Sequence, residues 1–149
     1  MPYIVGLATA LKLSQEHRQE NNARIAALRD RLIHGLLEGI PGAHVTGHPT
    51  ARLSNSASFA FEGVEGESML LNLDLKGVAA SSGSACSSGS AEPSHVLVAL
   101  GLPRELCYGS LRLTLGNENT PEDIDYVLSV LPSTVQKLRA LSPEYQEHV

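Results

Sequence analysis

Apolar side chains recur at helical spacing from residue 3 to residue 38. Leu7 and Leu11 lie four positions apart, and later members follow at steps of three or four: Ile25, Leu28, Leu32 and Leu36. Residues 14–24, between these parts, are mostly polar, which predicts an exposed middle and a helix that bends or divides into two pieces. Because the pattern begins almost at residue 1 without a capping residue, we expect the chain to start inside a larger protein.

Three further segments have helical signals. Residues 66–75 are apolar on one side and end at Lys76-Gly77, and residues 94–100 form a short helical stretch that ends at Gly101. The last helix is expected to start at Thr120-Pro121, with an acid three residues after the capping Thr. Pro132 is expected to kink or interrupt its apolar stripe, which begins with Ile124, Val127, Leu128 and Leu131.

Alternating apolar and polar residues predict strands in the rest of the chain. Residues 53–61 place one set of apolar side chains on a common face: Leu53, Ala57, Phe59 and Phe61. Residues 110–115 do the same with Leu111, Leu113 and Leu115. Shorter strands are expected at 44–46 and 78–80. Since few connections follow a regular strand–helix–strand order, we predict an α+β, two-layer fold, with a mainly antiparallel sheet covered by helices on one face.

Composition narrows the class of protein. The 149 residues, 42% of them hydrophobic, suffice for one core, and the net charge of −5 argues against a general nucleic-acid binder. Cys86 and Cys107 are too few for a disulfide framework, and no C-x-x-C pair indicates zinc, so we expect a reducing compartment. We find no signal peptide and no apolar run near the roughly 20 residues that span a bilayer. A soluble, cytoplasmic protein with no membrane contact is therefore expected.

Cys86 lies in a segment, residues 81–90, that contains only Ser, Gly, Ala and this one Cys. A thiol reacts as its thiolate, of which only a few per cent is present at neutral pH at the ordinary pKa of about 8.5. With no large neighbour to bury it, Cys86 is expected to be an exposed nucleophile on a flexible loop. A linker with an incidental cysteine remains an equal alternative on composition alone. A phosphate-binding loop is disfavoured because both glycine-rich motifs are missing.

Arg112 is the second candidate. It lies on the face of the predicted strand opposite the leucines, between Ser110 and Thr114. A guanidinium can hold a carboxylate through two parallel hydrogen bonds, which makes Arg112 a candidate substrate-binding residue. On spacing alone, an arginine on a solvated face or paired with a nearby acid is favoured.

The other reactive side chains do not form a candidate site. His44 and His48 lie around a turn and lack a further metal ligand. Cys107 is expected to be buried and inert. We nominate no lysine for Schiff-base chemistry, and no residue as a metal ligand.

Residues 81–97 resemble the active-cysteine loop of cysteine desulfurases of the NifS/IscS type, which are class V aminotransferases. The resemblance rests on Ser81-Ser82-Gly83-Ser84-Ala85-Cys86 and on Glu92-Pro93-Ser94-His95-Val96-Leu97. It extends over nearly the whole chain through Tyr3-Ile4-Val5-Gly6, Gly47-His48-Pro49, Glu65-Gly66-Glu67-Ser68, Gly109-Ser110-Leu111-Arg112 and Leu138-Arg139-Ala140-Leu141-Ser142-Pro143. A match of this length is more specific than a short motif.

This resemblance implies that residues 1–149 are the C-terminal small domain of a fold-type I enzyme that depends on pyridoxal 5′-phosphate (PLP). The enzyme would convert L-cysteine to L-alanine, hold the sulfur as a persulfide on Cys86 and pass it to an iron–sulfur scaffold protein, where Cys86 would serve as a transient cluster ligand. Arg112 would bind the substrate carboxylate, and a homodimer is implied. The PLP-binding large domain is absent, so no residue here is expected to bind PLP and the chain alone is expected to be inactive.

The sequence departs from the family at several positions. Cys107-Tyr108 stand where the family often has His, and Ser87 stands where it often has Thr. Two alternatives remain open. Another class V PLP enzyme, such as a transaminase or selenocysteine lyase, would share Arg112 without needing the loop that carries Cys86. A non-enzymatic sulfur carrier or interaction module would receive its sulfur from another protein.

Overall fold

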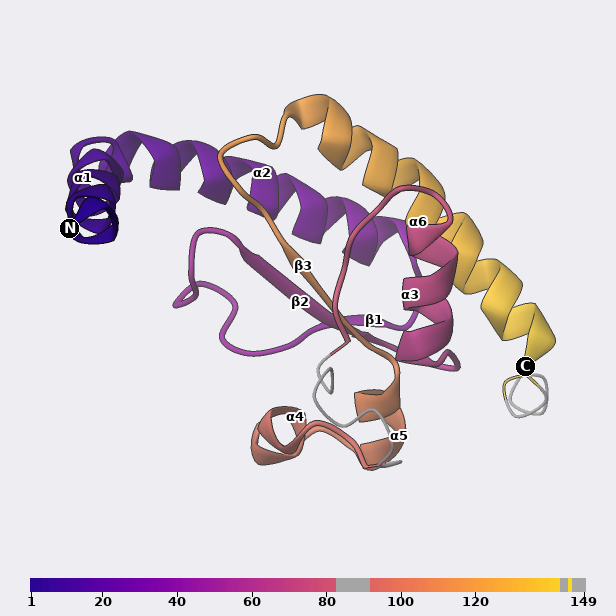
Figure 1. Ribbon diagram of the computed structural model, residues 1–149. Helices are drawn as coiled ribbons and strands as arrows, with labels where there is room; N and C mark the ends of the chain where they lie inside the picture. Colours follow the sequence, from indigo (N-terminus) through magenta and orange to yellow (C-terminus); the bar gives the residue numbers. More distant parts are fainter. Residues whose placement is uncertain (83–91, 143–144, 146–149) are drawn as a thin grey trace.

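Helices cover one face of a small sheet, and the helices and strands follow one another along the chain in an order close to that predicted. The computed structural model describes residues 1–82, 92–142 and 145; residues 83–91, 143–144 and 146–149 lie outside the description. The described elements, shown in Figure 1, are α1 (Pro2–Glu16), α2 (Arg18–Gly39), β1 (Ala43–Val45), β2 (Ser56–Phe61), α3 (Gly66–Asp74), α4 (His95–Ala99), α5 (Arg104–Tyr108), β3 (Ser110–Thr114) and α6 (Pro121–Leu141).

The described sheet has the order β1-β2-β3, and both strand pairs are antiparallel. In the register, Ala57 lies opposite Leu113 and Ser58 lies opposite Arg112. Because side chains alternate across a strand, Ala57 and Leu113 share one face of the sheet while Ser58 and Arg112 share the other. Only the first pair is buried. This result confirms the predicted faces at these four positions.

The core lies between the apolar face of the sheet and the helices α2, α3 and α6, which pack on it and on one another (Figure 1). The rings of Phe59 and Phe61 stack with centroids 5.7 Å apart, and both side chains are fully buried. Each helix contributes fully buried apolar side chains: Leu36, Met69, Leu73 and Leu131. Burial of each of these side chains stabilises the fold by about 1.5–3 kcal/mol relative to an exposed position. The predicted α+β, two-layer fold is therefore confirmed.

The long N-terminal helix divides into two pieces at His17, within the predicted polar middle. The second piece, α2, buries its apolar stripe. The first piece, α1, buries no residue, and its Leu7 and Leu11 are 73% and 61% exposed. In the described part of the chain, no helix is both long enough and apolar enough to cross a membrane.

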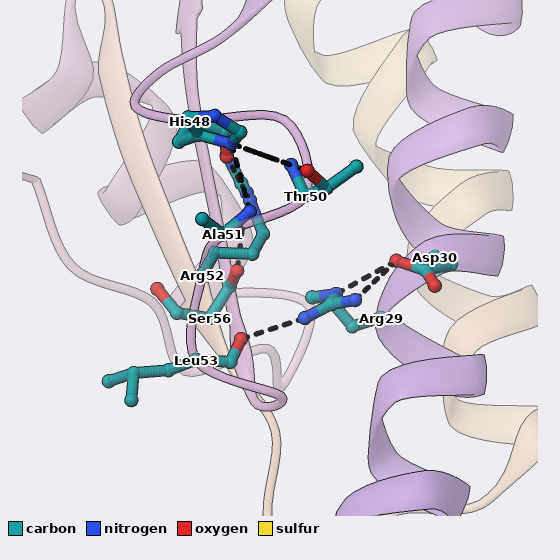
Figure 2. A network of polar contacts seen from close by, with 8 residues as sticks. All are labelled: Arg29, Asp30, His48, Thr50, Ala51, Arg52, Leu53 and Ser56. Carbon is teal, nitrogen blue, oxygen red and sulfur yellow. Dashed lines mark hydrogen bonds and ion pairs between the residues drawn. The ribbon is translucent and has the colours of Figure 1, made fainter.

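The strand predicted at 53–61 begins only at Ser56, and Leu53 is 74% exposed, so its predicted inward orientation is wrong. Two arginines bind the backbone of the preceding loop (Figure 2). Arg29 donates to the carbonyl oxygen of Leu53 (2.8 Å), and Arg52 donates to those of Thr46, His48 and Ser56. Because Arg29 holds the Leu53 carbonyl oxygen and Arg52 holds the turn, Leu53 lies in the loop and does not extend β2.

Two other differences lie on either side of the segment that contains Cys86. Residues 78–80, predicted as a strand, form none; the sheet contact there is a single bridge between Ser81 and Arg112. The helix α5 was not predicted. It covers only five residues, too few for a visible apolar period.

The capping box predicted for α6 is present. Thr120 Oγ1 accepts a hydrogen bond from the Asp123 backbone N–H, and Asp123 Oδ2 accepts one from the Thr120 N–H. The hydrogen bond from the Thr120 N–H and a second one from Asn119 Nδ2 lower the pKa of the Asp123 carboxyl below its ordinary value. The helix continues through Pro132, which does not interrupt it.

Gly109 is the position where an added methyl group should disturb the fold most directly. A Cβ there would lie 2.0 Å from the carbonyl oxygen of Phe61. Because this oxygen belongs to the backbone, the clash can be removed only by shifting the main chain. We expect Gly109→Ala to lower the free energy of unfolding by about 3 kcal/mol, as measured by urea denaturation. Gly6→Ala is the matched control, because a Cβ at Gly6 has no neighbour within 4 Å. Equal stabilities of the two variants would contradict this account of the packing.

Candidate functional site

Arg112 lies in β3 on the sheet face that carries no helix layer, and it pairs with Ser81. The Arg112 N–H donates to the Ser81 carbonyl oxygen (2.6 Å), and the Ser81 N–H donates to that of Arg112 (3.1 Å). The Arg112 guanidinium also reaches Ser81 Oγ, with Nη2 3.5 Å away. The chain that leads to Cys86 therefore leaves the described structure from a point beside Arg112.

The guanidinium of Arg112 is exposed and takes part in none of the ion pairs of the described residues, which involve Lys12, Arg29, Arg31 and His44. The alternative of an arginine neutralised by a neighbouring acid therefore finds no support in the described part of the chain. A guanidinium in this state has donors available for a carboxylate or another anion. Its role in substrate binding stays a prediction.

Cys86 lies outside the described residues, and its role also stays a prediction. The chain itself limits how far Cys86 can be from the sheet. Four peptide units link it to Ser82, so their Cα atoms are separated by at most about 14 Å when fully extended. Ser82 is buried beside Gly66, and its neighbour Ser81 is held by Arg112. The tether that carries Cys86 is thus fixed at its N-terminal end.

Cys107 lies in α5 and is 2% exposed, which confirms the expected burial. Its Sγ contacts the Leu102 carbonyl oxygen at 3.7 Å. Burial raises the pKa of this thiol, with Glu105 acting in the same direction and Arg104 in the opposite one. A buried thiol with a raised pKa is a poor nucleophile, which argues against Cys107 as a reactive thiol.

His48 in the turn and His44 in β1 both have structural partners. His48 Nδ1 accepts hydrogen bonds from the backbone N–H groups of Thr50 and Ala51, as expected for a turn residue. His44 Nε2 pairs with Glu62 Oε1 at 2.7 Å. No cluster of three or more His, Cys, Asp or Glu side chains suited to a metal ion occurs among the residues described.

Comparison with known proteins decides the family. Residues 1–127 match the family model of the aminotransferase class-V proteins. The chain belongs to the aminotransferase class-V family. Its similarity to cysteine desulfurases within that family extends over almost its whole length. It is 56% identical over 143 residues to "Cysteine desulfurase IscS" of Methanosarcina thermophila, covering 96% of this chain and 35% of that protein.

A second relative is also similar over almost the whole length of this chain. "Cysteine desulfurase IscS" of Clostridium botulinum is 47% identical over 148 residues, covering 98% of this chain and 37% of the relative. Among solved structures, a "NIFS-LIKE PROTEIN" superposes with a TM-score of 0.78 at 29% identity, covering 91% of this chain and 33% of that one. The resemblance to NifS/IscS-type proteins is confirmed. The chain spans about a third of the length of these relatives.

The described residues of this class V chain do not form a site for PLP. The cofactor needs a lysine for its Schiff base, held where a substrate can reach it. The described lysines, Lys12, Lys76 and Lys137, are exposed, and none lines the two cavities formed around Arg29 and Arg139. No cofactor step is therefore assigned to these residues.

Two buried arginines were missed by the sequence analysis. Arg29 stands four residues after Ile25, and Arg139 stands four after Val135, so each continues an apolar stripe at the next helical position. A charged residue at such a position is the signal that could have identified them. Arg29 fixes the loop before β2, and Arg139 donates through Nε to the carbonyl oxygen of Glu62.

Proposed function

We propose that this chain is the C-terminal part of a PLP-dependent cysteine desulfurase, in which Arg112 binds the carboxylate of L-cysteine and Cys86 accepts its sulfur. The observation that carries the proposal is the backbone pairing of Arg112 with Ser81. It joins the strand that bears the exposed guanidinium to the segment that bears the thiol, five residues before Cys86. A carboxylate held at Arg112 and a thiol tethered within about 14 Å of Ser82 can serve the same small amino acid.

The overall reaction balances without an external oxidant. L-cysteine and the Cys86 thiol give L-alanine and a Cys86 persulfide: the carbon–sulfur bond of the substrate breaks and a sulfur–sulfur bond forms. The substrate carbon is reduced as the sulfur is oxidised. The part of Cys86 in this reaction is that of a thiolate nucleophile.

The partners in this proposal follow from the same reaction. PLP would be held by polypeptide that corresponds to the remaining two thirds of the relatives, in a homodimeric, cytoplasmic enzyme. A persulfide on a tethered loop can be passed to another protein, and we propose an iron–sulfur scaffold as the acceptor. The support is the similarity to proteins named cysteine desulfurase IscS.

A chimera tests the proposal. In it, this chain replaces the matching third of the Methanosarcina thermophila relative, which is 56% identical. With PLP and L-cysteine, we expect the chimera to release L-alanine and to gain the mass of one sulfur atom on the peptide that contains Cys86. The chain alone with PLP should do neither. Alanine release by the chain alone, or a folded chimera with bound PLP that forms no persulfide, would refute the proposal.

A further inference from the structure

A row of four polar residues crosses the sheet on the face that carries no helix layer. Arg112 is bridged by Ser81 on one side and lies opposite Ser58 of β2 on the other. Thr46 follows β1 in the same register, and its N–H donates to the Ser58 carbonyl oxygen at 2.9 Å. Because directly opposed residues of antiparallel strands share a face, all four side chains lie on one side of the sheet.

Ser58 and Arg112 form the closer of the two kinds of residue pair in an antiparallel sheet. The backbone N–H and carbonyl groups of Arg112 both bond to Ser81, so they point away from β2. Arg112 and Ser58 are therefore a non-hydrogen-bonded pair, whose Cα atoms lie about 4.5 Å apart and whose side chains lie closer together than in a hydrogen-bonded pair. The Ser58 hydroxyl and the Arg112 side chain consequently start from adjacent points on the same face.

The hydroxyl group of Ser58 has a proton to donate to a ligand. Thr46 is only 5% exposed, and its hydroxyl donates to Ser58 Oγ at 2.7 Å. Ser81 donates its own hydroxyl proton to the Ser82 carbonyl oxygen at 3.0 Å. Ser58 is half-buried, and the residues that the structure describes provide no acceptor bonded to its hydroxyl proton. Of the three hydroxyl groups in the row, that of Ser58 is therefore the one that can donate to a ligand at Arg112.

We propose that Ser58 is a second substrate-binding residue, whose hydroxyl donates to the L-cysteine carboxylate that Arg112 holds. The inference rests on the proposed function, because it requires that carboxylate to lie at Arg112. A carboxylate has about four acceptor positions on its two oxygens, so it can bind a guanidinium and still accept a hydroxyl proton. Hydrogen bonds to a charged acceptor are about twice as strong as those between neutral groups. Ser58 therefore favours a free carboxylate over its ester and helps to determine specificity.

L-cysteine and its methyl ester, which lacks the negative charge, test this role in the chimera described above. We expect Ser58→Ala to lower kcat/KM for L-cysteine about tenfold, through KM, and that for the ester by less than about threefold. Ser58→Thr keeps a hydroxyl and should retain most of the preference for the acid. Ser56→Ala is the matched control, because Ser56 lies on the same face of β2 but opposite Thr114, and it should leave both values unchanged.

A second variant keeps the test informative if Ser58→Ala fails to fold. Ser58→Ala leaves the buried Thr46 hydroxyl without its acceptor, whereas Ser58→Ala combined with Thr46→Val removes both hydroxyl groups and this cost. We expect the combined variant to show the same selective loss for L-cysteine.

The kinetics of Arg112→Gln separate failure of this inference from failure of the proposed function. If Arg112→Gln raises the KM for L-cysteine while the Ser58 variants lose no activity, or lose the same factor for acid and ester, the inference is wrong and the proposed function stands. If Arg112→Gln leaves the KM unchanged, the proposed carboxylate site is wrong and the inference fails with it.

Discussion

Replacing Cys86 by Ser in the active chimera should lower the rate of L-alanine formation by about 10⁴-fold or more and abolish the persulfide. A serine hydroxyl is hardly ionised near neutral pH and cannot hold sulfur as a persulfide, so both parts of the proposed reaction are lost. Alanine release is measured by NMR, and the persulfide is measured by mass spectrometry of the peptide that contains residue 86.

Cys107 supplies the matched control for this experiment. Cys107→Ala removes the other thiol of the chain, which is buried and has a raised pKa. We expect this variant to retain the persulfide on Cys86 and most of its activity. Alanine formation that survives Cys86→Ser would instead favour an enzyme of the same family that does not use this thiol, such as a selenocysteine lyase.

Replacing Arg112 by Lys or Gln in the same chimera should raise the KM for L-cysteine by about 30- to 100-fold. A lysine keeps the charge but cannot form two parallel hydrogen bonds with a carboxylate, so even this substitution should be costly. The free energy of unfolding should hardly change, because among the described residues the side chain of Arg112 is held only by a long hydrogen bond of 3.5 Å to Ser81 Oγ. Initial-rate kinetics and urea denaturation measure the two quantities.

Arg18→Gln is the matched control for Arg112→Gln. Arg18 is an exposed arginine at the start of α2, far along the chain from β3, and its loss should leave the KM unchanged. An unchanged KM for both variants would remove Arg112 from substrate binding. A large drop in stability for Arg112→Gln would assign it a structural role instead.

The sequence predicted those parts of the fold that depend on local spacing. The division of the first helix lies in its polar middle, the leucines of β3 point to the core, and Thr120 with Asp123 caps α6 as expected. Each of these features is decided within a few residues. Side-chain alternation in a strand and capping in a helix require no knowledge of distant contacts.

The parts that could not be predicted depend on contacts between distant residues. Leu53 continues the alternation of β2, yet Arg29, 24 positions earlier, binds its carbonyl oxygen and holds it in a loop. Arg139 is buried because it reaches the backbone of Glu62, 77 positions away. The pairing of Arg112 with Ser81 likewise joins residues 31 positions apart. The sequence identified Cys86 and Arg112 as candidate site residues. It did not show that the segment leading to Cys86 pairs with Arg112 through Ser81.

The described sheet has edges that offer little template to another protein molecule. At one side β1 has only three residues, and at the other β3 is already engaged by Ser81 at its centre. Short and partly occupied edge strands are a common protection against amyloid-like growth. If copies of this chain aggregate in water, we therefore expect them to associate through the exposed apolar side chains of α1. Detergent, rather than a peptide that pairs with an edge strand, should then disperse the aggregates.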